Sequence, residues 1–114
     1  MAYIYCITNN INGKKYVGKT TKTPEERFKE HIQDRKRKRT EKRPLYSAMN
    51  KYGVENFSLT VLKECSIEEL SKYEMYYIDK LNTYHYGYNA TKGGDGKFLF
   101  DYDKIVELYK NGLN

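Results

Sequence analysis

The residues from 3 to 18 constrain the fold of this chain more than any other stretch. Two short runs rich in Tyr, Ile and Val, residue types that favour strands, flank a loop of Asn and Gly in the segment YIYCITNNINGKKYVG. Asn12-Gly13 suits the positive φ angles of a type I′ turn, and such a turn would place Ile11 opposite Lys14. The segment therefore predicts a β-hairpin.

The loop of this hairpin decides how far apart two tyrosines lie. Counting back from the turn puts Tyr5 and Ile7 on the same sheet face as Tyr16 and Gly18. With a two-residue turn, Tyr5 and Tyr16 would be four residues apart, about 13 Å at the usual rise per residue. A six-residue loop keeps the face and sets them opposite each other. The simpler alternative is that these tyrosines, with Tyr3, are ordinary aromatic residues of a sheet.

The charge of the chain points to a polyanionic partner. Its 114 residues are enough for one domain with a modest core, and they carry a net charge of +6. Basic residues are scattered along the chain and also form one run, Arg35-Lys36-Arg37-Lys38-Arg39. Nucleic acid is the expected partner, because phosphate contacts from such a run position DNA without reading its sequence. A solubilising surface is the alternative for the run.

The sequence favours neither a membrane nor an oxidising compartment. We find no apolar span, no signal peptide and no basic amphipathic helix with a broad apolar face, so we expect a cytoplasmic location. The two cysteines, Cys6 and Cys65, lie far apart and have no Cys or His neighbours at zinc spacing. We interpret both as small hydrophobic residues.

A first helix is predicted from Pro24 to about Asp34. Thr23 suits the N-cap, proline suits the first helical position, and two glutamates follow in the first turn. Phe28 and Ile32 are four residues apart and would anchor this helix to a core.

A second pair on the same helix is polar. Arg27 and His31 are also four residues apart, so they share a face adjacent to the apolar pair. A solvated arginine and a histidine without a role are the simpler readings. Because both follow directly after the tyrosine hairpin, we regard them as candidate functional residues.

Two further elements follow the basic run. A core-facing helix from Pro44 to Tyr52 is predicted from apolar residues at i, i+3, i+4 and i+7, with Gly53 as its C-cap. A third strand is predicted over Asn56 to Lys63, in which Phe57, Leu59 and Val61 alternate with Ser58, Thr60 and Leu62.

A carboxylate interrupts the apolar stripe of the next helix. Ser66 to Glu69 forms a capping box that opens a helix to about Leu81. The stripe runs through Ile67, Leu70, position 74, Tyr77, Ile78 and Leu81. Position 74 is a glutamate, which must reach water at a cleft, pair with a cation or bind a metal. An ion pair with a Lys or Arg, or a position at the edge of the stripe, is the simpler alternative to a functional role.

The last third of the chain is harder to interpret. Residues 84–92, YHYGYNATK, are rich in tyrosine and irregular, and Asn89 is expected to stabilise a turn by bonding the backbone. Residues 93–97 are interpreted as a Gly-rich linker. Residues 98–114 predict a short amphipathic helix and a Gly turn, which resemble the opening of a helix-turn-helix module and suggest that a recognition helix is missing.

Taken together, residues 3–92 resemble the GIY-YIG nuclease family, most closely its phage and intron-encoded homing endonuclease branch. The resemblance is carried by an ordered set of motifs: Tyr3-Ile4-Tyr5, Tyr16-Val17-Gly18, Arg27 with His31, Glu74, and Asn89. The triplets alone would be a weak match, but the ordered set is much more specific.

The resemblance implies a small α/β (α+β) domain over residues 1–92, with a three-stranded antiparallel sheet flanked by helices. It also implies an endonuclease that hydrolyses phosphodiester bonds of double-stranded DNA with one divalent metal ion, magnesium or alternatively manganese. Glu74 would be the metal ligand and Arg27 would stabilise the charge that develops on the phosphate.

The remaining motif residues have supporting roles by the same resemblance. Tyr5 or Tyr16 would activate or position water with help from His31, and the choice between the tyrosines stays open. Asn89 would hold the geometry of the site, and Gly18 is structural.

Two other functional classes fit part of the sequence. A non-catalytic nucleic-acid-binding module would use the same basic and tyrosine-rich surfaces but would not need both Arg27 and Glu74. An RNA-binding protein that stacks bases on tyrosines would explain the Tyr and Lys content. It would not explain a carboxylate inside an apolar stripe.

Overall fold

The structure of the protein is a computed structural model that describes residues 1–38, 40 and 42–93. Its strands are β1 (Ala2–Asn9), β2 (Lys15–Thr20) and β3 (Phe57–Cys65). Its helices are α1 (Pro24–Asp34), α2 (Pro44–Tyr52), α3 (Leu70–Leu81) and the short α4 (Thr83–Tyr86), with 3₁₀ turns at Val54–Asn56 and Ile67–Glu69. The predicted C-terminal helix, residues 94–97 of the predicted linker and Arg39 lie outside the described residues.

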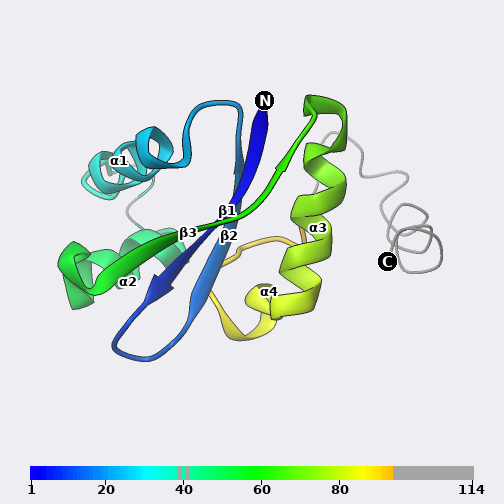
Figure 1. Cartoon of the computed structure of the whole chain (residues 1–114). Helices are drawn as coiled ribbons and strands as arrows, with labels where there is room; N and C mark the ends of the chain where they lie inside the picture. The colour runs from blue at the N-terminus through cyan, green and yellow to red at the C-terminus, as the bar shows by residue number, and fades with distance from the viewer. Residues whose placement is uncertain (39, 41, 94–114) are drawn as a thin grey trace.

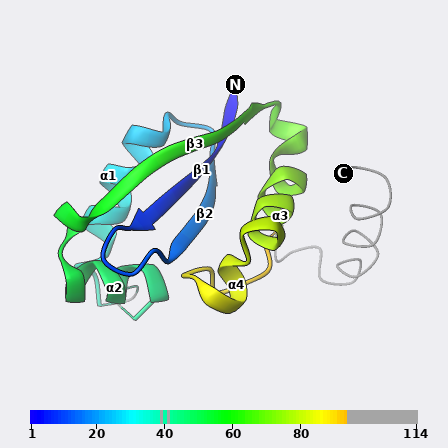
Figure 2. The same ribbon diagram turned by 60° about the horizontal axis from the view of Figure 1, so that its bottom comes forward.

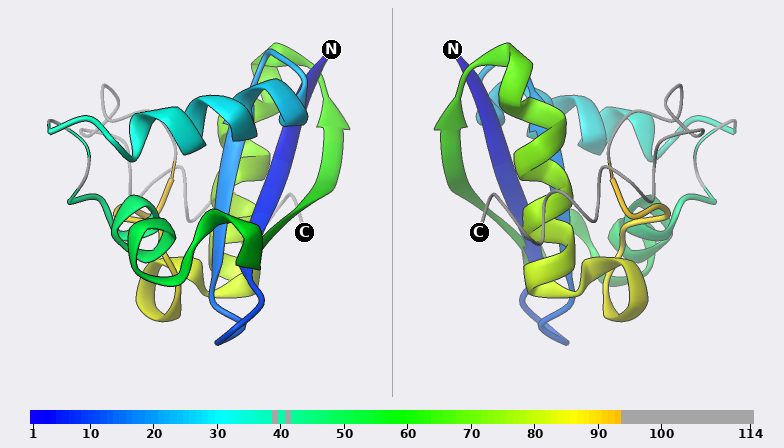
Figure 3. Two further views of the ribbon diagram at one scale, coloured as in Figure 1. Left: turned by 90° about the vertical axis from the view of Figure 1, so that its left-hand side faces the viewer. Right: turned by 90° about the vertical axis from the view of Figure 1, so that its right-hand side faces the viewer.

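The three strands form one antiparallel sheet in the order β2-β1-β3, as predicted. Helices α1 and α2 lie on one face of this sheet and α3 lies on the other (Figures 1 and 3). Each face has its own apolar cluster. The first contains Tyr5, Ile7, Leu45, Tyr46, Ala48, Met49, Phe57 and Tyr88. The second contains Ala2, Ile4, Val17, Cys65, Leu70 and Ile78.

The hairpin forms, but neither predicted register is right. Tyr5 pairs with Gly18 and Ile7 pairs with Tyr16, so the two tyrosines share a face as diagonal neighbours with ring centroids 6.3 Å apart. Gly18 allows this contact, because a Cβ there would lie 2.3 Å from the Tyr5 ring. The type I′ turn is also wrong, since Asn12 does not have positive φ.

Asparagine side chains shape the hairpin loop in place of the two-residue turn. The Asn9 side-chain oxygen accepts from the Ile11 N–H, and that of Asn12 accepts from the Lys14 N–H, each at 2.9 Å. Both side-chain amides also donate to the Tyr88 hydroxyl, at 3.0 and 3.2 Å. The loop is wide because these side chains, one of them fully buried, satisfy backbone groups that a tight turn would pair directly.

The first two helices begin and end as predicted, whereas the glutamate helix and the third strand differ in detail. Ser66 opens a 3₁₀ turn, and the α-helix starts only at Leu70, so Ile67 leaves the apolar stripe and is 64% exposed. Leu81 ends the helix and is also exposed.

The third strand, β3, contains an irregularity. Its register with β1 shifts by one residue opposite Ile4 and Tyr5, and Val61 there is exposed in spite of the predicted alternation.

The chain after α4 covers the outer edge of β2, which has no strand partner (Figure 2). The Tyr88 N–H donates to the Lys15 carbonyl at 2.8 Å. The Asn89 side chain accepts from the Val17 N–H and donates to the Val17 carbonyl, both at 2.8 Å. Asn89 thus bonds the backbone as predicted, but it bonds a strand far away in sequence and acts as a one-residue strand partner.

His31 joins α1 to the sheet and to α2. The side chain is 2% exposed, with Nε2 at 2.7 Å from the Tyr5 hydroxyl and Nδ1 at 2.7 Å from the Tyr46 hydroxyl. Burial and the nearby Arg27 charge lower the pKa of His31 to about 3. The imidazole is therefore neutral in the folded protein at physiological pH.

Both cysteines are buried and free, consistent with their interpretation as small hydrophobic residues. No helix within the described residues has the length and hydropathy needed to cross a membrane.

We expect Asn89→Ala to lower the free energy of unfolding by about 1 to 3 kcal/mol, because it leaves the Val17 N–H and carbonyl without partners. Urea denaturation of both proteins measures the change. Asn10→Ala is the matched control, since the exposed Asn10 side chain accepts a 3.1 Å hydrogen bond from the equally exposed Ser58, and its loss should change stability by less than about 0.5 kcal/mol. Equal losses in the two variants would contradict the assigned role of Asn89.

A second prediction concerns the stability of the protein at acidic pH. The pKa of His31 lies below its value in the unfolded chain, so its contribution to stability is complete above about pH 6.5 and is lost as the pH falls toward 3. The stability difference between wild type and His31→Gln should therefore shrink by about 2 kcal/mol between pH 6.5 and 4.5. Urea denaturation at several pH values measures it. His85→Gln, which replaces an exposed histidine whose side chain has no hydrogen bond within the described residues, is the control for loss of a histidine.

Candidate active site

A cavity of about 380 Å³ opens at the covered edge of β2. Its walls come from five parts of the chain: β2, α1, the start of α2, α3 and the segment that follows α4. The lining residues are Tyr16, His31, Arg43, Pro44, Leu45, Tyr46, Glu74, Tyr88, Asn89, Ala90 and Thr91. Four of the predicted site residues are therefore brought together here: Tyr16, His31, Glu74 and Asn89.

Glu74 reaches the cavity from α3. It is 9% exposed and lies among the buried residues Leu70, Met75 and Ile78 of the same helix. The Lys19 ammonium on β2 lies 3.7 Å from the carboxylate and also donates to the Ser71 hydroxyl at 3.0 Å. The sequence left open whether Glu74 reaches a cleft or pairs with a cation. In the structure both occur, because the carboxylate has the Lys19 ammonium beside it and lines the cavity.

The two motif tyrosines occupy different environments. Tyr16 lines the cavity, whereas Tyr5 is 1% exposed and lies behind it in the core. Burial, and after it the Glu74 charge, raise the pKa of Tyr16 to about 12. Burial also raises the pKa of Tyr5, with a further contribution from Tyr16. Both hydroxyls therefore keep their protons at neutral pH in the resting protein.

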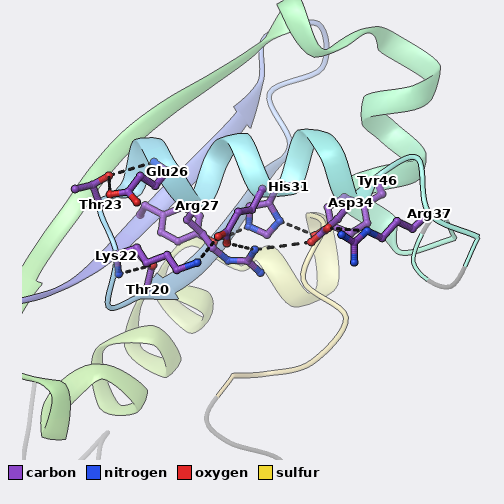
Figure 4. A network of polar contacts seen from close by, with 11 residues as sticks. Thr20, Lys22, Thr23, Glu26, Arg27, His31, Asp34, Arg37 and Tyr46 are labelled. Atoms are coloured by element: carbon purple, nitrogen blue, oxygen red, sulfur yellow. Dashed lines mark hydrogen bonds and ion pairs between the residues drawn. The ribbon is translucent and has the colours of Figure 1, made fainter.

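Arg27 lies beside the site but does not line the cavity. Its guanidinium pairs with Glu30 at 3.1 Å and with Asp34 at 4.0 Å, along one side of α1 (Figure 4). Lys22 pairs with the same Glu30 carboxylate. In the resting protein Arg27 therefore shares the Glu30 carboxylate with Lys22 and the Asp34 carboxylate with Arg37.

Two tyrosines and an arginine of the cavity wall were not identified as site residues from the sequence. Tyr46 and Arg43 come from the start of α2, where Tyr46 lies next to the predicted apolar stripe, and Tyr88 comes from the irregular segment. Lys19, the partner of Glu74, was also missed. The sequence shows only that Tyr46 is an aromatic residue beside an apolar stripe. That position does not reveal which polar group the Tyr46 hydroxyl contacts.

The basic run has a mixed environment. The Arg35 guanidinium donates a hydrogen bond to the Asn50 side chain at 3.0 Å. The Arg37 guanidinium lies 3.4 Å from the Asp34 carboxylate. Lys36 and Lys38 are exposed. Two lysines of the run are therefore available for phosphate contacts, and Arg39 lies outside the described residues.

Comparison with known proteins identifies the family. Residues 1–89 match the family model described as the GIY-YIG catalytic domain. The fold superposes on the catalytic domain of homing endonuclease I-TevI with a TM-score of 0.66 and 30% identity, covering 80% of this chain and 99% of that one. A variant of the same I-TevI catalytic domain gives a TM-score of 0.73 and 29% identity, covering 84% of this chain and 100% of the other.

Longer viral proteins share the sequence. The chain is 35% identical to protein 019R of Invertebrate iridescent virus 6 over 85% of its length, and 33% identical over 93% to the Enterobacteria phage T4 protein that bears the name "Putative endonuclease segE". These matches cover 33% and 48% of the two relatives, so the chain spans between a third and a half of their length. With its cavity formed by the motif residues, the chain belongs to the GIY-YIG nuclease family.

Proposed function

We propose that this protein is a metal-dependent endonuclease that hydrolyses phosphodiester bonds of double-stranded DNA. One observation carries the proposal: the Glu74 carboxylate and the Tyr16 hydroxyl line the same cavity, on a chain with a net charge of +6. A module that only bound nucleic acid would have no use for a largely buried carboxylate in a cavity with basic surroundings.

The donor set fits a hard divalent cation held mainly by substrate and water. Among the described residues no group of three or more His, Cys, Asp or Glu side chains could hold a metal, so Glu74 would be the protein ligand. Magnesium is commonly bound by one or two carboxylates together with waters and substrate phosphates. When bound, such an ion supplies charge stabilisation at phosphate oxygens and a more acidic water.

The other residues divide the remaining tasks. Because Tyr16 faces the cavity and keeps its proton at neutral pH, we assign it to positioning the attacking water by hydrogen bonding. Arg43 offers a cation at the cavity wall, and within the described part of the chain no carboxylate pairs with it. Arg27 is the second cation, since an arriving phosphate can compete with Glu30 and Asp34 for its guanidinium.

Glu74→Ala tests the proposal. It should abolish magnesium-dependent nicking of plasmid DNA, since losing the metal ligand raises the barrier by several kcal/mol. DNA affinity and melting temperature should stay close to wild type, because the partner Lys19 is partly exposed and such pairs contribute only about 0 to 1 kcal/mol.

The control for this experiment lies on the same helix. Asp79→Ala removes an exposed carboxylate of α3 and should leave nicking unchanged. A Glu74→Ala protein that nicks DNA at the wild-type rate would remove Glu74 from the active site. One that melts far below the wild type would instead show a structural ion pair.

DNA affinity should depend steeply on salt. If about five phosphates are contacted, log K should fall against log salt with a slope near −4.5. Replacing the exposed Lys36 and Lys38 by alanine should make the slope shallower by about 2, as fluorescence anisotropy with a labelled duplex would measure.

A second pair of exposed lysines controls for net charge. Lys63 and Lys80 lie on β3 and α3, away from the basic run, and their replacement removes the same two charges. This variant should keep the wild-type slope. Equal changes in both variants would mean that overall charge, and not the basic run, sets the affinity.

A further inference from the structure

A buried chain of three side chains connects the core to the cavity. It runs from the Tyr5 hydroxyl through His31 Nε2 and Nδ1 to the Tyr46 hydroxyl, with both hydrogen bonds at 2.7 Å. Tyr5, His31 and Tyr46 are each 2% exposed or less, and of the three His31 and Tyr46 line the cavity. The direction of these two hydrogen bonds determines what Tyr46 can offer to a substrate.

Only two directions are compatible with a neutral imidazole. Such a ring carries one N–H and one acceptor nitrogen, so one tyrosine must donate to His31 and the other must accept from it. Either Tyr5 donates to Nε2 and Nδ1–H donates to Tyr46, or both bonds run in the opposite direction.

The surroundings of Tyr5 decide between them. Within the described residues His31 Nε2 is the sole hydrogen-bond partner of the Tyr5 hydroxyl, which lies in the core. If Nε2 carried the proton, the Tyr5 O–H would point into the core without an acceptor, at a cost of about 1 to 3 kcal/mol. Tyr5 therefore donates to Nε2, and the Nδ1–H of His31 donates to the Tyr46 oxygen.

This direction leaves the Tyr46 proton for another acceptor. The Arg27 side chain also hydrogen-bonds to Tyr46, and because a guanidinium can only donate, it does not take up the Tyr46 proton. The Tyr46 side chain lies on the cavity wall. Burial raises the pKa of Tyr46, so its hydroxyl keeps its proton at neutral pH; the Arg27 and Arg43 charges act in the opposite direction, and the Asp34 charge adds to the rise. Two guanidinium groups are thus close enough to Tyr46 to influence its charge.

We propose that the Tyr46 hydroxyl donates a hydrogen bond to a non-bridging oxygen of the phosphodiester bound in the cavity. This proposal rests on the proposed function, and it adds a catalytic residue that touches the substrate. His31 becomes a positioning residue, because it orients Tyr46 and contributes no proton of its own. Tyr5, as the first donor of the chain, holds the tautomer of His31.

The energetic argument concerns the transition state. Negative charge builds up on the phosphate oxygens as the bond breaks, so a donor already aimed at them strengthens during the reaction. Hydrogen bonds in a chain polarise one another, and the Tyr46 O–H becomes a better donor when its oxygen accepts from His31. Because the three side chains are buried, they need little reorganisation when substrate arrives.

The first test needs no substrate. Long-range ¹⁵N–¹H NMR correlations of the histidine ring distinguish the Nδ1–H from the Nε2–H tautomer. We expect His31 to be the neutral Nδ1–H form at pH 7 in the full chain, and the exposed His85 serves as the internal reference. An Nε2–H tautomer would overturn the proposal, because Tyr46 would then donate its proton to His31 Nδ1 and could not donate it to a substrate.

The second test uses cleavage of DNA with one phosphorothioate at the cut position, prepared as separate Rp and Sp forms. Sulfur accepts hydrogen bonds poorly, so one of the two forms should be cleaved more slowly by the wild type. Tyr46→Phe should cleave ordinary DNA about 10 to 100-fold more slowly at saturating substrate and should lose most of that sulfur effect. The exposed Tyr86→Phe is the control and should behave as wild type.

The outcomes separate this proposal from the proposed function. If the wild type cuts DNA and Tyr46→Phe shows the same sulfur effect as the wild type, Tyr46 does not touch that oxygen and the proposal fails. If the wild type cuts no DNA, the proposed function fails, and the substrate role of Tyr46 fails with it, whichever tautomer His31 has. If Tyr46→Phe does not fold, the tautomer measurement on the wild type decides.

Discussion

One buried imidazole holds the domain and its cavity together. His31 is the point where α1, β1 and α2 meet, and its two 2.7 Å hydrogen bonds join residues that are 26 and 15 positions away in sequence. A neutral ring can do this because it offers one donor and one acceptor, whereas a charged ring would offer two donors and carry a costly charge into the core. The low pKa of His31 and the position of the helices are thus two results of the same burial.

The cavity exists because β2 is an edge strand. A central strand would be covered on both sides, but here α3 and the segment after α4 approach the free edge, and Asn89 takes the place of the missing strand with two bonds to Val17. This arrangement brings Glu74 from one face of the sheet and His31 from the other to the same opening. Motif residues that are distant in sequence therefore meet at the edge of the sheet.

Local signals in the sequence predicted local structure well. Thr23 and two well-placed prolines set the helix boundaries, and the resemblance to the family placed Tyr16, His31, Glu74 and Asn89, which do meet at one cavity. The hairpin register was missed because the buried Asn9 and the exposed Asn12 bond to Tyr88, a residue more than 70 positions later. Three other residues were missed for a similar reason: Lys19, Arg43 and Tyr46. Each has an ordinary position in its own element, and it joins the site only through neighbours that come close in the folded chain.

Two charged groups of the site, Arg27 and Glu74, have ion-pair partners in the resting protein. Arg27 pairs with Glu30 and Asp34 on α1, whereas the Lys19 ammonium, a less strongly bonding cation, lies 3.7 Å from the Glu74 carboxylate. Partly exposed pairs of this kind contribute only about 0 to 1 kcal/mol, so a phosphate group can exchange with them at small cost. On the proposed function, binding of a polyanion would move positive charge toward the cavity and leave Glu74 as its negative group, which is the polarity that a site acting on a phosphodiester requires.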